Sequence, residues 1–126
     1  MILVDSSVWI DHLRAGDTRL AALLEGGRVL THPFIVGELA LGSLRQRGIV
    51  LGALSGLPSA AVANDLEVLK FIETHALSGS GIGYIDAHLL AAVRLTGESR
   101  LWTKDRKLRM VGDRLGLTIA FDQGGQ

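Results

Sequence analysis

The sequence contains no cysteine, and this absence removes several kinds of chemistry at once. Disulfide bonds, catalytic thiolates and cysteine-ligated zinc are all excluded. The sequence also has no apolar run close to the ~20 residues that a membrane-spanning helix needs. Its first apolar run has no basic segment before it and reaches Asp5 too soon for a secretory signal peptide. We therefore expect a cytoplasmic protein with no membrane partner.

The sequence also lacks an excess of charge of either sign. It has 13 basic and 13 acidic residues, so its formal net charge at pH 7 is zero. A nucleic acid would therefore have to bind a local basic patch and not the protein as a whole. The length of 126 residues and the 48% content of hydrophobic residues predict one folded domain with a real core. We expect this single domain to cover residues 1–126, with a polar tail at 121–126.

The first five residues organise the rest of the sequence. Residues 1–4 are apolar, which is typical of a short strand buried on both faces of a parallel sheet. The run ends at Asp5, and Ser6 and Ser7 then offer capping groups for a helix. Open α/β sheets bind ligands beyond the carboxyl ends of their strands. We therefore expect Asp5 to anchor an acidic site that holds a metal ion.

Strand-like and helix-like segments alternate along the remaining chain. This order predicts an α/β fold with a central parallel sheet of four to five short strands and helices on both faces. The further strands are expected at residues 28–31, 60–63, 100–103 and 117–120. Helices are expected at residues 7–13, 18–25, 34–44, 49–57, 65–77, 84–96 and 106–115. Ile35, Leu39 and Leu41 are expected to face inward from the third of these helices. The apolar face of the fifth is expected to comprise Leu66, Leu69, Phe71, Ile72 and Leu77. Asp17 is expected to cap the second helix, and Asn64 with Glu67 to form a capping box at the start of the fifth.

Three further carboxylates stand at suggestive places. Glu38 and Asp86 lie near the starts of predicted helices, and Asp105 follows a strand as Asp5 does. A simpler explanation is available for each, because the helix dipole favours acids at helix starts and aspartate is a common cap. Their spacing carries no metal signature of its own. Asp11 is expected to face solvent or to pair with Arg14.

Two other kinds of site are disfavoured. The four histidines are scattered along the chain, so a histidine–metal centre is not expected. The glycines at 79, 81 and 83 follow no strong strand and lack the GxGxxG order of a dinucleotide-binding loop. They are better explained as a flexible entry to the helix that carries Asp86.

Four stretches resemble the PIN-domain ribonucleases, specifically the VapC-like toxins of bacterial VapBC-type toxin–antitoxin pairs. The matching stretches are Leu3–Asp11, Glu38–Gly42, Gly81–Ala91 and Leu101–Leu108. They occur in the right order over nearly the whole chain, and Ser6 replaces the threonine that is commonest in the family. The resemblance implies that the four acids meet in one pocket and bind Mg²⁺ or Mn²⁺; these are Asp5, Glu38, Asp86 and Asp105.

The resemblance also implies a function. The expected activity is hydrolysis of RNA by a metal-activated water, leaving a 5′-phosphate and a 3′-hydroxyl. Asp5 and Asp86 are the expected direct ligands of the metal. The implied partners are an RNA substrate, a small VapB-like antitoxin whose C-terminal segment blocks the pocket, and a second copy of the chain in a homodimer or larger toxin–antitoxin assembly.

Residues around Asp105 are the expected auxiliary groups. A basic cluster could hold RNA phosphates beside the metal, although a solvated helix face is the alternative; it comprises Lys104, Arg106, Lys107 and Arg109. Ser7 and Thr103 could hydrogen-bond to the acids, although helix capping and strand packing explain them equally well. Two other functions stay open: a phosphatase or DNA nuclease with the same pocket, and a non-enzymatic interaction module.

Overall fold

A computed structural model describes residues 1–121, and its centre is a small parallel sheet. The strands are β1 (Ile2–Val4), β2 (Val29–Leu30) and β3 (Arg100–Trp102), in the order β2-β1-β3. Leu3 pairs with Leu30 on one side and with Leu101 on the other. All three residues of β1 are buried, as the continuous apolar run predicted. The first strand therefore forms the middle of the sheet.

The α/β class is confirmed, but the expected number of four to five strands is wrong for residues 1–121. The segments expected at 60–63 and 117–120 form no strands. A single bridge pairs Thr31 with Ser59, just before the first segment, and another pairs Leu101 with Thr118 in the second. Alanines fill most of 60–63, and alanine has a low strand propensity. The second segment hydrogen-bonds only around Leu101, through Leu117 and Ile119. Both segments therefore lie at the sheet edges without extending it as strands.

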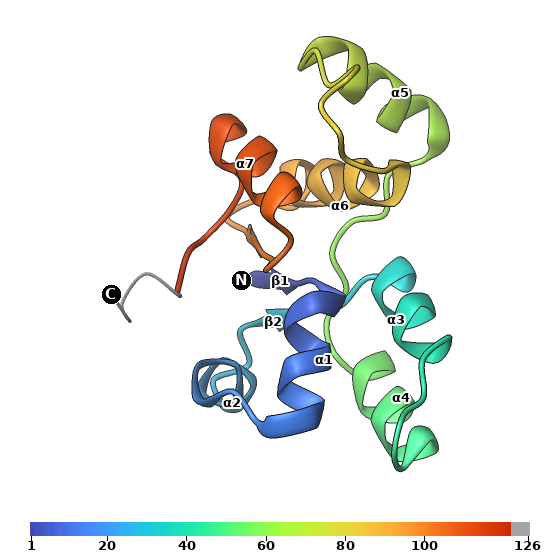
Figure 1. Cartoon of the computed structure of the whole chain (residues 1–126), viewed down its shortest axis with the longest axis vertical. Coiled ribbons are helices and arrows are strands. Elements are labelled where there is room, and N and C mark those ends of the chain that lie inside the picture. Colours follow the sequence, from blue (N-terminus) through green and yellow to red (C-terminus); the bar gives the residue numbers. More distant parts are fainter. Residues whose placement is uncertain (122–126) are drawn as a thin grey trace.

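Seven helices cover the sheet within residues 1–121. They are α1 (Ser6–Ala15), α2 (Thr18–Glu25), α3 (Pro33–Ala40), α4 (Arg47–Ser55), α5 (Asp65–Thr74), α6 (Tyr84–Leu95) and α7 (Arg106–Leu115). In the view of Figure 1, α1, α2 and α4 extend below the strands, α3 lies beside them, and α5 to α7 lie above them. Helix α6 packs on β3 and α5, while α3 packs on α1 and α4. The described chain contains no helix long and apolar enough to cross a membrane.

Two helix starts follow the capping pattern of the sequence. Asp17 accepts hydrogen bonds from the backbone N–H groups of Arg19 and Leu20 at the start of α2. Asn64 and Glu67 form a reciprocal capping box at the start of α5. These local signals were sufficient because the bonds they predict join residues only two or three positions apart.

Three leucines expected to point inward do not. Helix α3 ends at Ala40, so Leu41 is 91% exposed. On α5, Leu66 and Leu69 are 78% and 53% exposed, because Val68 and Phe71 form the buried face. Sequence periodicity therefore gave the correct type of element and part of each buried face, since Ile35, Leu39 and Phe71 are buried as expected.

The C-terminal segment begins with an apolar contact. Phe121 is the first residue of the predicted polar tail, and its ring lies edge-on to Trp102 with centroids 4.8 Å apart. The side chain of Arg19 donates a hydrogen bond to the carbonyl oxygen of Phe121. The rest of the predicted tail, 122–126, lies outside the described residues.

Candidate functional site

The site is built at the carboxyl ends of β1 and β3. These strands are parallel neighbours, so Asp5 and the segment that leads to Asp105 leave the sheet at the same edge. The backbone N–H of Asp5 donates to the carbonyl oxygen of Trp102 over 2.9 Å. Asp5 itself is only 6% exposed. The sheet register therefore brings together two acids that are a hundred residues apart in sequence.

Two hydroxyl groups hold the Asp5 carboxylate. Ser7 Oγ and Thr103 Oγ1 donate to the same oxygen, Oδ2, over 2.8 and 2.7 Å. The backbone N–H of Lys104 donates to Ser7 Oγ over 3.0 Å, and that of Asp105 donates to Thr103 Oγ1 over the same distance. These bonds fix the orientation of Asp5 and connect both strand ends.

The capping explanation fails for Asp5 and holds for Asp105. Asp5 occupies the N-cap position of α1, but its side chain makes no capping hydrogen bond. Asp105 does cap α7, because its Oδ1 accepts from the backbone N–H of Leu108 over 3.0 Å. The two acids follow parallel strands in the same way and yet use their side chains differently.

Glu38 reaches the site from α3. Its Oε1 accepts a hydrogen bond from Ser6 Oγ over 3.1 Å, and Ser6 is the chain neighbour of Asp5. Burial raises the pKa of Glu38 most, the Ser6 bond opposes this, and the negative charges of Asp5 and Asp86 raise the pKa further. The sequence analysis named Ser6 as a helix-capping group and not as a partner of Glu38, although a hydroxyl beside Asp5 was a usable signal.

Asp86 completes the set from the first turn of α6. Its Oδ2 accepts from the backbone N–H of Gly83 over 3.2 Å, so the residue serves as a helix cap as well. Burial is the largest cause that raises the pKa of Asp86, and the charges of Asp5 and Asp105 raise it further. Glu38 and Asp86 therefore lie close enough to other acids for negative charge to disfavour their ionised forms. We call the four acids Asp5, Glu38, Asp86 and Asp105 the acid cluster.

The donor set of the acid cluster suits a hard divalent cation, since every side chain offers carboxylate oxygen. Within residues 1–121, no three His, Cys, Asp or Glu side chains are placed so that they could together hold a metal ion. The charge of Asp86 contributes to the raised pKa of Glu38, and the charges of Asp5 and Asp105 contribute to that of Asp86. A cation bound beside these carboxylates would offset the repulsion.

The basic cluster is partly neutralised by nearby acids. Lys104 Nζ lies 2.7 Å from Asp11 Oδ2, and the Asp11 side chain is 47% exposed. Asp11 therefore faces solvent, one of the two expected alternatives, and its salt bridge is with Lys104 and not with Arg14. Arg109 Nε lies 3.8 Å from Asp113 Oδ2. Lys104, Arg106 and Arg109 line a shallow hollow beside Asp105. This surface keeps a cationic character, but two of its four cations have acidic neighbours.

One of the four histidines, His32, caps a helix, a role that the sequence analysis did not predict. His32 is fully buried, and its Nδ1 accepts from the backbone N–H of Phe34 at the start of α3. Burial and the neighbouring His88 lower the pKa of His32 to about 4. The neutral ring can therefore act as an acceptor and cap the helix that carries Glu38.

Comparison with known proteins places the chain in a family. The model of the PIN domain matches residues 2–113, so this chain belongs to the PIN-domain family. It is similar to two proteins named Ribonuclease VapC32, from the CDC 1551 / Oshkosh and H37Rv strains of Mycobacterium tuberculosis. Each is 46% identical over 120 residues, which is 95% of this chain and 97% of the relative. The family expected from the four matching stretches is confirmed.

Proposed function

We propose that this protein is a metal-dependent endoribonuclease that acts as the toxin of a type II toxin–antitoxin pair. The observation that carries the proposal is the acid cluster, which gathers oxygen donors from four distant segments at one edge of the sheet. The similarity to Ribonuclease VapC32 over nearly the whole chain supports RNA as the substrate. The absence of an overall positive charge agrees with local binding of RNA at this edge.

Each acid is assigned a role within this proposal. Asp5 and Asp86 are the direct metal ligands, while Glu38 and Asp105 complete the site and orient the attacking water. Bound Mg²⁺ or Mn²⁺ would supply an acidified water and neutralise charge on the phosphate oxygens. Ser7 and Thr103 keep Asp5 in one orientation through Oδ2, and Ser6 does the same for Glu38 through Oε1. RNA would be cut to a 5′-phosphate and a 3′-hydroxyl.

The partners follow from the same proposal. A small VapB-like antitoxin would neutralise the toxin by covering the acid cluster with its C-terminal segment, for example through an arginine that pairs with the acids. We further propose a cytoplasmic homodimer of one-domain chains that assembles with the antitoxin. The basic residues of α7 would contact RNA phosphates beside the cleaved bond.

Substitution of two ligands tests the assignment. Asp5→Asn and Asp86→Asn should each reduce RNA cleavage by more than about 100-fold, since a direct ligand matters at least as much as the groups that orient it. Cleavage is measured on purified protein with Mg²⁺ or Mn²⁺ by gel separation of labelled RNA. Asp11→Asn is the matched control, because Asp11 lies on α1, the helix that follows Asp5, and forms a salt bridge with Lys104. If either Asp5→Asn or Asp86→Asn cleaved RNA at the wild-type rate, the assignment of that residue as a metal ligand would be contradicted.

A substrate comparison separates the other functions. RNA, single-stranded DNA and a small phosphomonoester are offered to the same preparation with each metal. Cleavage of RNA alone supports the proposal, whereas faster turnover of DNA or of the phosphomonoester favours the nuclease or phosphatase alternative. A protein that turns over none of them and binds no metal would be an interaction module.

A further inference from the structure

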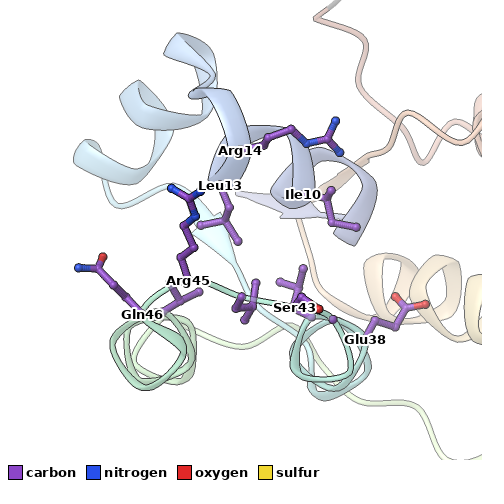
Figure 2. Close-up of a pocket in the computed structure, with 11 residues that line it drawn as sticks. Ile10, Leu13, Arg14, Glu38, Ser43, Arg45 and Gln46 are labelled. Carbon is purple, nitrogen blue, oxygen red and sulfur yellow. The ribbon is translucent and has the colours of Figure 1, made fainter.

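A groove of about 650 Å³ lies beside the acid cluster, between α1, α3 and the segment that joins α3 to α4. Its size is within the usual range for ligand pockets. The lining contains apolar side chains and two arginines (Figure 2). We call the apolar lining residues Leu13, Leu39 and Leu44 the floor, and the lining residues Arg14 and Arg45 the rim.

Glu38 joins this groove to the acid cluster. Its side chain belongs to the lining of the groove, and its Oε1 accepts the hydrogen bond from Ser6. Figure 2 shows the Glu38 carboxylate pointing away from the arginines, toward the helix drawn in pale orange. The groove therefore begins where the acid cluster ends. A polymer bound across the acids would reach it with its next units.

The two arginines are available cations on this groove. Within residues 1–121, the salt bridges involve neither Arg14 nor Arg45, and both side chains are exposed. Lys104 is in contrast bonded to Asp11, and Asp11 is also the acid whose pKa Arg14 lowers from a longer range. Figure 2 shows Arg45 reaching from the α3–α4 segment toward α1, which carries Arg14 and Leu13. The rim therefore offers positive charge from two opposite walls.

We propose that this groove is a substrate subsite, in which Arg14 and Arg45 bind phosphates of single-stranded RNA next to the cleaved bond and the apolar floor receives one unstacked base. The inference rests on the proposed ribonuclease function. A single RNA strand is complementary to both parts of the groove. Its anionic backbone suits the arginines of the rim, and the flat apolar face of a base suits the floor. Sequence-specific proteins commonly read single-stranded RNA through bases splayed out of the stack.

RNA binding in EDTA tests the rim without any need for cleavage. The Kd of a fluorescein-labelled 12-nucleotide single-stranded RNA is measured by anisotropy. Arg14→Gln and Arg45→Gln should each weaken binding about threefold to fivefold, the size of an exposed charged contact. The slope of log Kd against log salt should fall by about 0.7 for each phosphate contact removed. Arg28→Gln is the matched control, because Arg28 is an exposed arginine at the opposite end of the strands.

An abasic scan tests the floor. Each nucleotide of the RNA is replaced in turn by an abasic one, and one position should show a specific loss of affinity for the wild-type protein. Leu13→Ser should abolish that position-specific loss, since Leu13 contributes to the floor and is already 39% exposed. A control Leu95→Ser changes a leucine at the end of α6 that is 49% exposed, and it should leave the loss intact.

The outcomes separate this inference from the proposed function. If the wild-type protein cleaves RNA with metal but the Arg14→Gln/Arg45→Gln double variant binds RNA as Arg28→Gln does, the subsite is wrong and the ribonuclease stands. If the wild-type protein binds RNA in EDTA but never cleaves it with metal, the proposed function fails instead. If the double variant kept its RNA affinity but no longer bound an acidic amphipathic peptide, the groove would receive a protein segment. That outcome would also overturn the inference.

Discussion

At the scale of one residue, the Asp5 side chain makes no helix-capping hydrogen bond and instead accepts hydrogen bonds from Ser7 and Thr103. Asp5 stands at an N-cap position but makes no capping bond, whereas Asp17, Asn64 and Asp105 cap their helices. An N-cap side chain contributes about 1 kcal/mol to helix stability. The Asp5 carboxylate is held instead by hydroxyls from α1 and from the segment after β3. This arrangement keeps the carboxylate in a fixed orientation at the site.

Thr103→Val should weaken both folding and metal binding. The change removes the donor to Asp5 Oδ2 and leaves the backbone N–H of Asp105 without its acceptor, in a place where Thr103 is 3% exposed. We expect the free energy of unfolding to fall by about 1–3 kcal/mol. Mn²⁺ affinity should fall about 10–100-fold. Urea unfolding and calorimetric titration measure the two effects. Thr103→Ser keeps the hydroxyl and should stay near wild type, and equal losses in both variants would contradict the role of the hydroxyl.

Asp86→Asn should stabilise the metal-free protein at neutral pH. Burial and neighbouring acids raise the pKa of Asp86 in the folded state, so the folded state keeps a proton that the unfolded state has released. The free energy of unfolding therefore falls as pH rises from about 4 toward neutrality.

The gain from Asp86→Asn at pH 7 should be on the order of 0.5 kcal/mol after allowance for solvent screening. The gain should vanish near pH 3, where both states carry the proton. Urea unfolding in EDTA at the two pH values measures it. A variant that is less stable than wild type at pH 7 would contradict the repulsion within the acid cluster. Asparagine can still accept the capping bond from Gly83, so helix α6 keeps its start.

At the scale of the elements, each acid is delivered by a different helix or strand end. Glu38 lies in the last turn of α3, not near the helix start as expected, and Asp86 lies in the first turn of α6. β1 and β3 bring Asp5 and the segment before Asp105 to one edge, α3 brings Glu38 and α6 brings Asp86. The position of α7 depends on a close contact with the final segment. Gly112 of α7 lies against Thr118, and Leu90 of α6 lies on the same side.

Gly112→Ala should therefore destabilise the protein. The added Cβ would collide with Thr118 Cγ2, so the threonine side chain or the helix would have to shift. Overpacking of this kind costs about 1–3 kcal/mol. Urea unfolding measures the loss, and the double variant Gly112→Ala/Thr118→Ser should recover part of it because serine lacks the methyl group. Equal stability of the single and double variants would show that the collision is relieved elsewhere.

At the scale of the whole molecule, metal binding should stabilise the fold. A cation that binds only the folded state adds about 2.7 kcal/mol at 100 times its Kd, which corresponds to roughly 10 °C in Tm for a chain of this size. Thermal unfolding with Mn²⁺ should show this rise in the wild type and in Asp11→Asn but not in Asp5→Asn. A similar rise in Asp5→Asn would place the metal outside the acid cluster.

Local patterns in the sequence determined much of this protein. The buried first strand, the caps at Asp17 and Asn64 and the bounds of α7 follow from bonds between close neighbours, and all were predicted. The four candidate acids could be selected because their flanking stretches resemble a family, which the match over residues 2–113 confirms. Their neighbourhood in space was not derivable from spacing alone.

Only the tertiary structure decided which groups meet. The number of strands, the outward faces of Leu41 and Leu66, the Lys104–Asp11 pair and the Ser6–Glu38 bond each depend on contacts between segments far apart in the chain. Helical periodicity and capping report interactions within a few residues, whereas burial and electrostatic pairing depend on what the fold packs alongside. The sequence therefore determined the elements and the candidate acids, and the packing of parallel strands brought those acids to one edge.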